Sequence, residues 1–342
     1  MTVATAVPAE IVVEHVIGKE YPGDYKHPAS ITEIGGKELY VSYYGGGGEY
    51  EDDSKVWGMR RALDSDTWSE PVVIADTPFL AEGNPVVWEA PDGVVWLFYV
   101  QRYGDTWSQS RIKGKISLDG AKTWSDSFMV AFEQGMMVRA RPITLMDGDY
   151  LLPVYHETGS DRENVGADTT SLFLRFNPKT HAWTESNRIY SRLGNLQPSP
   201  VQIDENYLIS YSRRGGGYDP MTDGYLVRSE SHDGGHTWSK GEDSAFPNPN
   251  AATDFIKLAN GHLVLAYNDN MNDRTPLTVA ISEDDDKTWP HKRDIGTGDN
   301  TFAYPMLIQT TDGKIRLLYT TDNRATVMLA TFDEADIVGH TK

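Results

Sequence analysis

Six positions with the same spacing to a downstream turn carry most of the side chains that could do chemistry. Each lies nine residues before the turn of a predicted strand hairpin, and the set consists of His27, Asn84, Arg139, Gln197, Ala252 and Tyr304. Arg141 follows two residues after Arg139. An imidazole, a guanidinium and a phenol together can transfer protons and bind an anion. For any single residue, contact with channel water is the simpler explanation, but the combination predicts a site, with His27, Gln197 and Tyr304 as candidate catalytic residues.

Further arginines follow the second strand of two predicted hairpins. Arg213 and Arg214 precede a glycine-rich loop, and Arg274 follows the segment NDNMND in the next repeat. Binding residues concentrate on such loops. Because a planar guanidinium matches a carboxylate with two parallel hydrogen bonds, we expect an acidic oligosaccharide or glycan as the partner. The predicted substrate-binding residues are Arg213, Arg274, Arg139, Arg141 and Asn84.

The loop at residues 45–55, GGGGEYEDDSK, offers carboxylates for acid–base work. Its four acidic residues are Glu49, Glu51, Asp52 and Asp53. Like charges packed this closely raise the pKa of at least one of them, which suits a general acid. A solvated acidic loop tip is the equally simple alternative.

Two internal repeats indicate the elements that hold these residues. One is a strand, a turn and a second strand ending near a tyrosine, and its turns lie at Gly36, Gly93, Gly148, Asn206, Gly261 and Gly313. The copies recur about every 55 residues, and no amphipathic helix separates them. We therefore predict an all-β, six-bladed β-propeller of four-stranded antiparallel blades, with residues 1–342 as a single domain. The first strand of each blade then lines a central channel, where the six positions converge.

The sixth repeat begins near Thr301 and has three clear strands. The N-terminal stretch EIVVEHVIG is predicted to supply its fourth strand, which closes the ring and leaves no free sheet edge.

The other repeat is a turn that ends in Thr-Trp. SLDGAKTW ends at Trp124, SHDGGHTW at Trp238 and SEDDDKTW at Trp289, with a variant at Trp68 and a weaker copy at Trp183. We expect the Asp side chain to accept a hydrogen bond from an amide two residues on, while Thr-Trp packs the turn onto the next strand. These turns fall between outer strands, so we interpret them as structural and not catalytic.

Composition excludes several classes of function. The 342 residues carry a formal net charge of −19 and no cysteine. This charge disfavours nucleic acid and anionic membranes as partners, and without cysteine there is no disulfide and no thiolate nucleophile. No apolar run is long enough to span a membrane, and the first ten residues show no secretory signal, so the compartment stays open, as does the oligomeric state. The spacing of the histidines predicts no metal site, and no residue pattern calls for a cofactor.

The turn SHDGGHTW, repeated around a six-bladed ring, resembles the Asp-box (BNR) repeat of the sialidase (neuraminidase) superfamily, and AYPMLIQTTDGKIRLLY is similar to its last blade. The resemblance implies Tyr304 as nucleophile and Arg213 and Arg274 as two of three carboxylate-binding arginines. It places the acid/base in the loop at residues 45–55, with Asp53 or Asp52 as the first candidates and Glu51 next. Two positions depart from the family. HPASI places His27 at the site of the first arginine, and Gln197 stands where the glutamate that assists the tyrosine is expected. Because a glutamine cannot take the phenol proton, His27 is the candidate base.

These observations leave three functions open. The first is a sialidase-like glycoside hydrolase acting on a terminal acidic sugar. The second is a lyase or rhamnosidase acting on a rhamnose–uronic acid linkage, in which His27 or Tyr304 would abstract the C5 proton. The third is a non-catalytic glycan-binding propeller. Trp57, Trp107 and Tyr218 lie in or near loops where they could stack on sugar rings.

Overall fold

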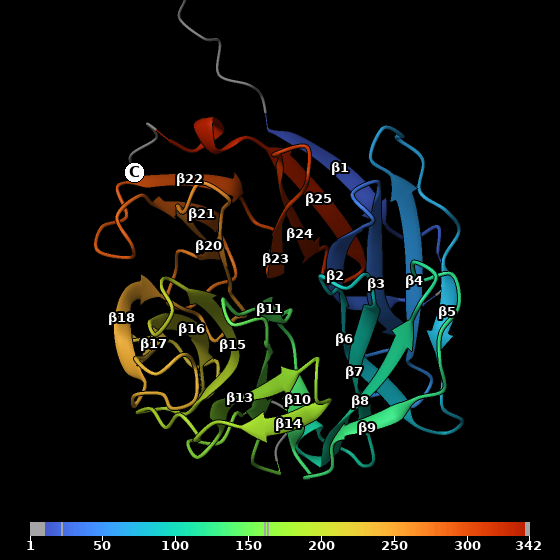
Figure 1. Cartoon of the computed structure of the whole chain (residues 1–342), viewed down its shortest axis with the longest axis horizontal. Coiled ribbons are helices and arrows are strands. Elements are labelled where there is room, and N and C mark those ends of the chain that lie inside the picture. Colours follow the sequence, from blue (N-terminus) through green and yellow to red (C-terminus); the bar gives the residue numbers. More distant parts are fainter. Residues whose placement is uncertain (1–10, 22, 161, 163, 339–342) are drawn as a thin grey trace, which may run out of the picture.

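The computed structural model describes residues 11–21, 23–160, 162 and 164–338. Within these ranges the strands form six antiparallel sheets arranged around a common centre (Figure 1). The prediction of an all-β, six-bladed propeller is therefore confirmed. The first ten residues, in which we looked for a secretory signal, lie outside the described ranges.

Each sheet is one blade, and in blades one to five the strands follow one another in sequence from the channel outward. Blade one consists of β2 (Tyr25–Ile34), β3 (Glu38–Gly46), β4 (Lys55–Ala62) and β5 (Val72–Ala75). Blade two consists of β6 (Ala81–Glu89), β7 (Val95–Arg102), β8 (Ser110–Ser117) and β9 (Phe128–Ala131). Blade four consists of β15 (Asn195–Gln202), β16 (Leu208–Arg214), β17 (Tyr225–Ser231) and β18 (Glu242–Pro247). Blade five consists of β19 (Asp254–Lys257), β20 (Leu263–Asn268), β21 (Leu277–Ser282) and β22 (His291–Gly296).

Blade three departs from four continuous strands because its inner strand is split in two. The pieces are β10 (Met136–Val138) and β11 (Ile143–Thr144), and both pair with β12 (Tyr150–His156). β13 (Thr170–Asn177) and β14 (Ala182–Glu185) complete the sheet. The interruption falls at Arg139–Pro142, where proline cannot donate a backbone hydrogen bond.

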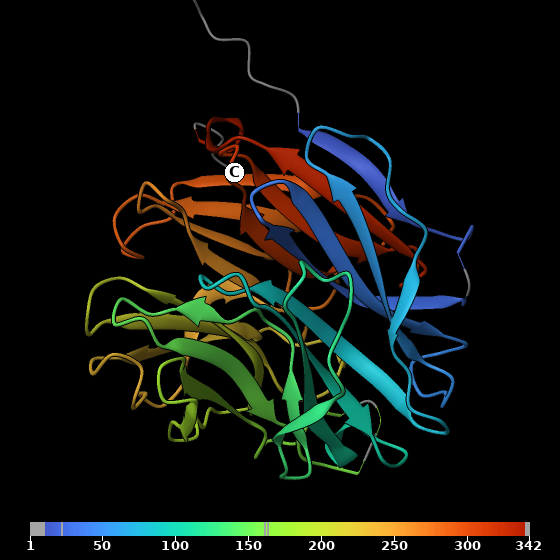
Figure 2. The ribbon, with the colours of Figure 1, turned by 45° about the vertical axis from the view of Figure 1, so that its right-hand side comes forward.

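The N-terminal strand closes the ring. β23 (Ala303–Gln309), β24 (Ile315–Thr321) and β25 (Thr326–Phe332) form blade six, and β1 (Val12–Ile17) pairs antiparallel with β25 from Val12 opposite Thr331 to Ile17 opposite Val327. Figure 2 shows the blue first strand beside the red last strands. The predicted closure is thus confirmed for the described strand, while Glu10, the first residue of the predicted stretch, lies outside the described residues.

Short helices complete the elements. η1 (Trp107–Gln109) precedes β8 and η2 (Glu334–Asp336) follows β25. Neither of these two helices of the described chain is long and apolar enough to cross a membrane.

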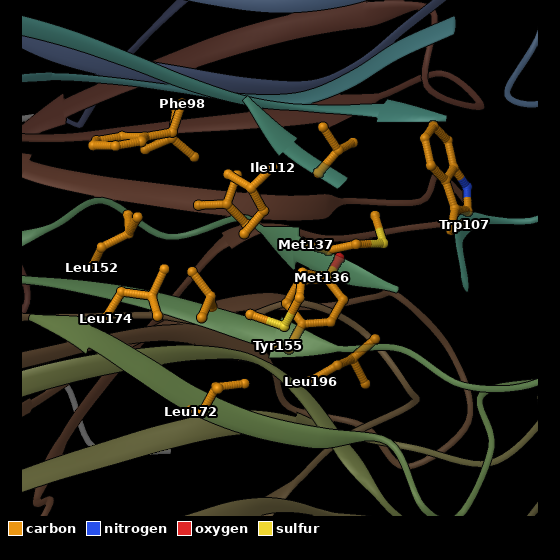
Figure 3. Close-up of a cluster of buried hydrophobic side chains, with 14 of the residues drawn as sticks. Phe98, Trp107, Ile112, Met136, Met137, Leu152, Tyr155, Leu172, Leu174 and Leu196 are labelled. Atoms are coloured by element: carbon orange, nitrogen blue, oxygen red, sulfur yellow. The ribbon is translucent and has the colours of Figure 1, made fainter. Parts of the chain in front are cut away.

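The core lies between neighbouring blades. One cluster joins blades two and three and includes Phe98, Ile112, Leu152 and Leu174, all buried (Figure 3). The side chains of Trp107, Met137, Tyr155 and Leu196 belong to the same cluster and also line the pocket described below. Close packing of this kind fixes side-chain rotamers, so the cluster holds one wall of the pocket rigid.

The Thr-Trp turns lie between the third and fourth strands, as predicted. In the copy of blade two, Ser117 Oγ donates to Asp119 at 2.7 Å, and Asp119 accepts from the amide of Thr123 at 2.9 Å. The same bonds recur around Asp233 and Asp284. The prediction that the aspartate accepts from an amide two residues on is wrong, because the aspartate accepts from the threonine amide four residues on. The turns stand at the opposite ends of the blades from the pocket and take no part in it.

Candidate active site

Four inner strands carry a bulge where they enter the channel. The register shifts in β2, β6, β15 and β23 against their neighbours, and the residues in these bulges are His27, Asn84, Gln197 and Tyr304. Each is followed by proline. Asn84, Gln197 and Tyr304 have φ values of 44°, 56° and 52°, a strained region for residues other than glycine. Bulges of this kind re-aim side chains, and such strain clusters at functional sites.

The bulge residues line one pocket together with side chains from the connections between second and third strands. The pocket holds about 600 Å³ of empty space, part of it open to solvent. The charged or phenolic lining residues supplied by these connections are Glu49, Tyr50, Glu157, Arg162, Tyr218, Arg274 and Arg324, and Arg213 stands at the end of the second strand β16. The predicted residues His27, Asn84, Gln197, Arg213, Arg274 and Tyr304 are therefore brought together. Residues at the same position on separate strands meet here, because all six blades present the same end to this face.

Arg213 is held in place by neutral groups. Its guanidinium donates to Asn250 Oδ1 at 2.7 Å, to Tyr218 Oη at 3.0 Å and to Tyr304 Oη at 2.9 Å. Arg274 donates to the Asn250 carbonyl at 3.1 Å, and its Nη1 is buried without a hydrogen-bond partner among the described residues. Neither arginine forms a salt bridge within the described chain, so the two positive charges that face the pocket are not paired directly with a carboxylate.

Arg324 is the third cation at the pocket, and it has a partner. Its Nη1 contacts Glu49 Oε2 at 2.7 Å, and its guanidinium lies over the ring of Tyr25. Burial and the positive charges of Arg213 and Arg324 lower the pKa of Arg274, although the phenols of Tyr218 and Tyr304 oppose the change. All three arginines line the same pocket.

The Tyr304 hydroxyl receives hydrogen bonds from two donors. Arg213 Nη1 donates at 2.9 Å and Gln197 Nε2 at 3.3 Å, while Gln197 Oε1 accepts from Arg213. Burial alone raises the pKa of Tyr304, but the charges of Arg213 and Arg274 outweigh it and lower the pKa below the ordinary 10.0. Gln197 thus stabilises the phenolate as a donor, where a glutamate would act as a base.

His27 packs against Tyr304 edge to face, with ring centroids 4.1 Å apart. Its Nδ1 lies 2.7 Å from Thr320 Oγ1. Burial, together with Arg324 and Arg274, lowers the pKa of His27 well below 6.5. The imidazole is therefore neutral at neutral pH, and in the described structure it makes no hydrogen bond to the phenol hydroxyl.

The carboxyl groups that line the pocket are not the two aspartates that the sequence predicted. Asp52 and Asp53 do not line the pocket, because Asp52 pairs with Arg102 at 3.1 Å and Asp53 accepts from the Gly47 amide at 3.0 Å. Glu49, from the same loop, does enter the pocket, where it also accepts from Trp107 Nε1 at 3.3 Å. Glu157, which directly follows β12, is the second carboxyl of the lining, and burial raises its pKa to about 7.

The two inner-strand arginines of blade three lie outside the lining. Arg139 is buried beneath Tyr304, with its guanidinium 5.2 Å from the ring centroid and a 2.8 Å bond to the Tyr304 carbonyl. Arg141 lines a separate cavity, with Lys257 and Gln202, at the other mouth of the channel. The two arginines lie in the break between β10 and β11, where the chain is not extended as in a strand. Arg139 supports the tyrosine from below, and Arg141 does not share its pocket.

Of the aromatic residues considered for stacking, Trp107 and Tyr218 line the pocket, and Trp57 does not. Trp57 stacks on Tyr43 with an interplanar angle of 13°. Arg324 and Glu157 escaped the sequence analysis. Both lie in the connection between the second and third strands of a blade, and Arg213 lies at the end of a second strand. This place in the repeat is the sequence feature that could have identified them.

One cluster with metal-binding chemistry occurs among the described residues, away from the pocket. Ligand atoms of His262, Glu283 and Glu334 lie within 4.8 Å of one another, and His262 Nδ1 is already 2.5 Å from Glu334. These residues belong to blades five and six at the ends opposite the pocket, so they take no part in its chemistry.

Residues 37–317 match the family of BNR repeat-like domains. No curated protein sequence matches the chain. Among solved structures, it is similar to the Hadza microbial sialidase Hz136, with a TM-score of 0.77 and 16% identity over 92% of this chain and 67% of that one. The intramolecular trans-sialidase from Ruminococcus gnavus gives 0.75 and 13% over 93% and 96%.

A third neighbour is the α-L-arabinofuranosidase Arb93A from Fusarium graminearum, with a TM-score of 0.67 and 12% identity over 96% of this chain and 99% of that one. At these identities the likeness shows the fold. The solved neighbours include sialidases that share this fold. The family match covers residues 37–317, which is more than half of the chain, so the chain belongs to the family of BNR repeat-like domains.

Proposed function

We propose that this protein is a glycoside hydrolase that removes a terminal acidic sugar, with sialic acid as the first substrate to test. The observation that carries the proposal is the pair Arg213 and Arg274. Both face the pocket without a salt-bridge partner in the described structure, and Arg274 Nη1 lacks any hydrogen bond there. A buried, uncompensated guanidinium is costly, so the pair favours a ligand that brings a carboxylate.

The arginines would hold the sugar carboxylate beside the hydroxyl of Tyr304. That oxygen then attacks the anomeric carbon, as tyrosine nucleophiles do in sialidases. The lowered pKa of Tyr304 supports this role, because more of the side chain is phenolate than in an ordinary tyrosine. A neutral sugar such as arabinose would leave both charges unpaired, which argues against that substrate class.

The test is incubation with α-sialosides and assay of free sialic acid. We expect release by the wild type and none by Tyr304→Phe, whose stability in thermal denaturation should stay close to that of the wild type. Release at an unchanged rate by Tyr304→Phe would remove the tyrosine from the reaction.

A parallel incubation with rhamnosyl–glucuronate oligosaccharides separates the other functions. An unsaturated uronate product that absorbs in the ultraviolet would identify a lyase. Thermal stabilisation by sialosides without any product would identify a binding propeller.

A further inference from the structure

Hydrolysis of a glycosidic bond requires a proton donor for the departing oxygen. The described pocket lining offers two carboxyl groups, Glu49 and Glu157, and one imidazole, His27. The imidazole has a pKa well below 6.5, so at neutral pH it is the neutral form and lacks the second proton that an imidazolium acid would donate. The choice therefore lies between the two glutamates.

Glu49 is held as a counter-ion. Its Oε2 lies 2.7 Å from Arg324 Nη1, and its Oε1 accepts from Trp107 Nε1 at 3.3 Å. A guanidinium and an indole can only donate hydrogen bonds, so both oxygens of Glu49 already accept from donors of the protein.

Glu157 lies in the opposite environment. It stands at the end of β12, where its amide donates to the Gly135 carbonyl at 2.8 Å and fixes the backbone. Its carboxyl is partly buried and makes no hydrogen bond to any other described residue. Burial and the negative charge of Glu49 raise its pKa, and Arg213 opposes the change without cancelling it, so the value is about 7.

Glu157 and Tyr304 therefore lie in one pocket with pKa values displaced in opposite directions. The acid keeps its proton to neutral pH, while the phenol loses its proton more readily than usual. Such a divergence is the usual mark of an acid and a nucleophile that work together. Because donors occupy the phenol oxygen, Glu157 is not needed as the base that activates Tyr304.

Resting on the proposed function, we propose that Glu157 is the general acid and base of this site, in place of an aspartate from the loop at residues 45–55. In the first step, Tyr304 reacts as the phenolate: its oxygen forms a bond to the anomeric carbon, the glycosidic bond breaks, and the leaving oxygen takes the Glu157 proton. In the second step, Glu157 removes a proton from water, the water oxygen bonds to the anomeric carbon, and Tyr304 leaves as phenolate.

The test compares leaving groups. A general acid contributes about 10²- to 10⁴-fold, and its loss matters little when the leaving group is already acidic. We expect Glu157→Gln to lower kcat/KM for a sialoside with a sugar leaving group by about 10²- to 10⁴-fold, and for an acidic aryl sialoside by less than about 10-fold. Equal losses on both substrates would assign Glu157 a structural role.

Two further variants sharpen the comparison. Glu185→Gln makes the same change on the exposed outer strand of the same blade and should match the wild type on both substrates. Asp53→Asn tests the position implied by the family. If Asp53→Asn, and not Glu157→Gln, shows the dependence on the leaving group, the acid lies on the loop at residues 45–55 and our inference is overturned.

A measurement without substrate keeps this inference separate from the proposed function. The infrared difference spectrum between the wild type and Glu157→Gln reports the protonated carboxyl directly. We expect its band to be present below pH 7 and to disappear above it. A carboxyl that titrates near its ordinary 4.5 would overturn the inference even if sialosides are hydrolysed, and titration near 7 with no sialoside turnover would count against the substrate instead.

Discussion

Glu157 should cost the protein stability at the pH where it serves as an acid. Its pKa rises from 4.5 to about 7 on folding. Below pH 4.5 both the folded and the unfolded chain hold the proton, so the carboxyl costs nothing there. As the pH rises from 4.5 to 7 the unfolded chain releases its proton first, and the free energy of unfolding falls. Above pH 7 the folded state carries the full cost of a carboxylate in the pocket.

The size of this cost sets the expected effect of Glu157→Gln. A raised pKa of this extent corresponds to about 3 kcal/mol at 1.36 kcal/mol per pKa unit. Water in the open part of the pocket screens the charge, so we expect a gain in stability of about 1–3 kcal/mol above pH 7. For a chain of this length the gain corresponds to a rise in Tm of about 2–4 °C.

The assay is thermal denaturation of the wild type and Glu157→Gln at about pH 5 and about pH 8. The difference in Tm should be small at the lower pH and full at the higher pH. Glu185→Gln, on the exposed strand β14, controls for the loss of one negative charge and should show no such dependence. A gain of equal size at both pH values, or none at pH 8, would refute the assignment of a buried, protonated carboxyl.

Three other outcomes follow from the described contacts. Arg274→Ala should raise KM for a sialoside by about 10-fold or more with a smaller effect on kcat, since the lost guanidinium faces the ligand; an unchanged KM would exclude it from binding. Gln197→Glu places a carboxylate beside the phenol and should raise the pKa of Tyr304. The pKa is measured from the absorbance of the tyrosinate, and a constant or lower pKa would contradict the donor role of Gln197. Deletion of residues 1–17 removes β1 and exposes the edge of β25, so Tm should fall; an unchanged Tm would show that the ring needs no closing strand.

The fold could be predicted from the sequence because the repeats report local geometry. A hairpin turn such as that at Gly313 recurs in each of the six blades, and the Thr-Trp turn, such as that ending at Trp238, recurs in each of the first five, so their spacing counts the blades. The split of the inner strand of blade three could not be seen in this way. It arises at Arg139–Pro142, where the chain bends while keeping the same number of residues before its turn.

Part of the site could be predicted because the chain keeps a fixed spacing. His27, Asn84, Gln197 and Tyr304 stand at the same distance from their turns, because a bulge at the same point aims each into the channel. The connections after the second strands differ in length from blade to blade, so position after a strand indicates candidates such as Arg274 but no fixed spacing selects among the residues they carry. Ring geometry then decides which of their side chains reach the axis.

The effect of ring geometry on which side chains reach the pocket is clearest in the loop at residues 45–55. Four acidic residues share it, and the sequence does not distinguish them. Asp53 is occupied by the Gly47 amide of its own loop, and Asp52 by Arg102 of the next blade, so only Glu49 extends to the pocket, where Arg324 meets it.

The net charge of −19 is compatible with a cationic pocket, because the place of each acidic side chain in the ring decides whether it reaches the pocket. Acidic side chains such as Asp119, Asp233 and Asp284 are bound by their own turns at the other end of the blades. Their field is screened over about 8–10 Å in physiological salt, whereas Arg213 and Arg274 act within the pocket, where screening is weak. An anionic sugar therefore meets repulsion only at long range, and once inside it meets two guanidinium groups that no carboxylate of the described chain neutralises.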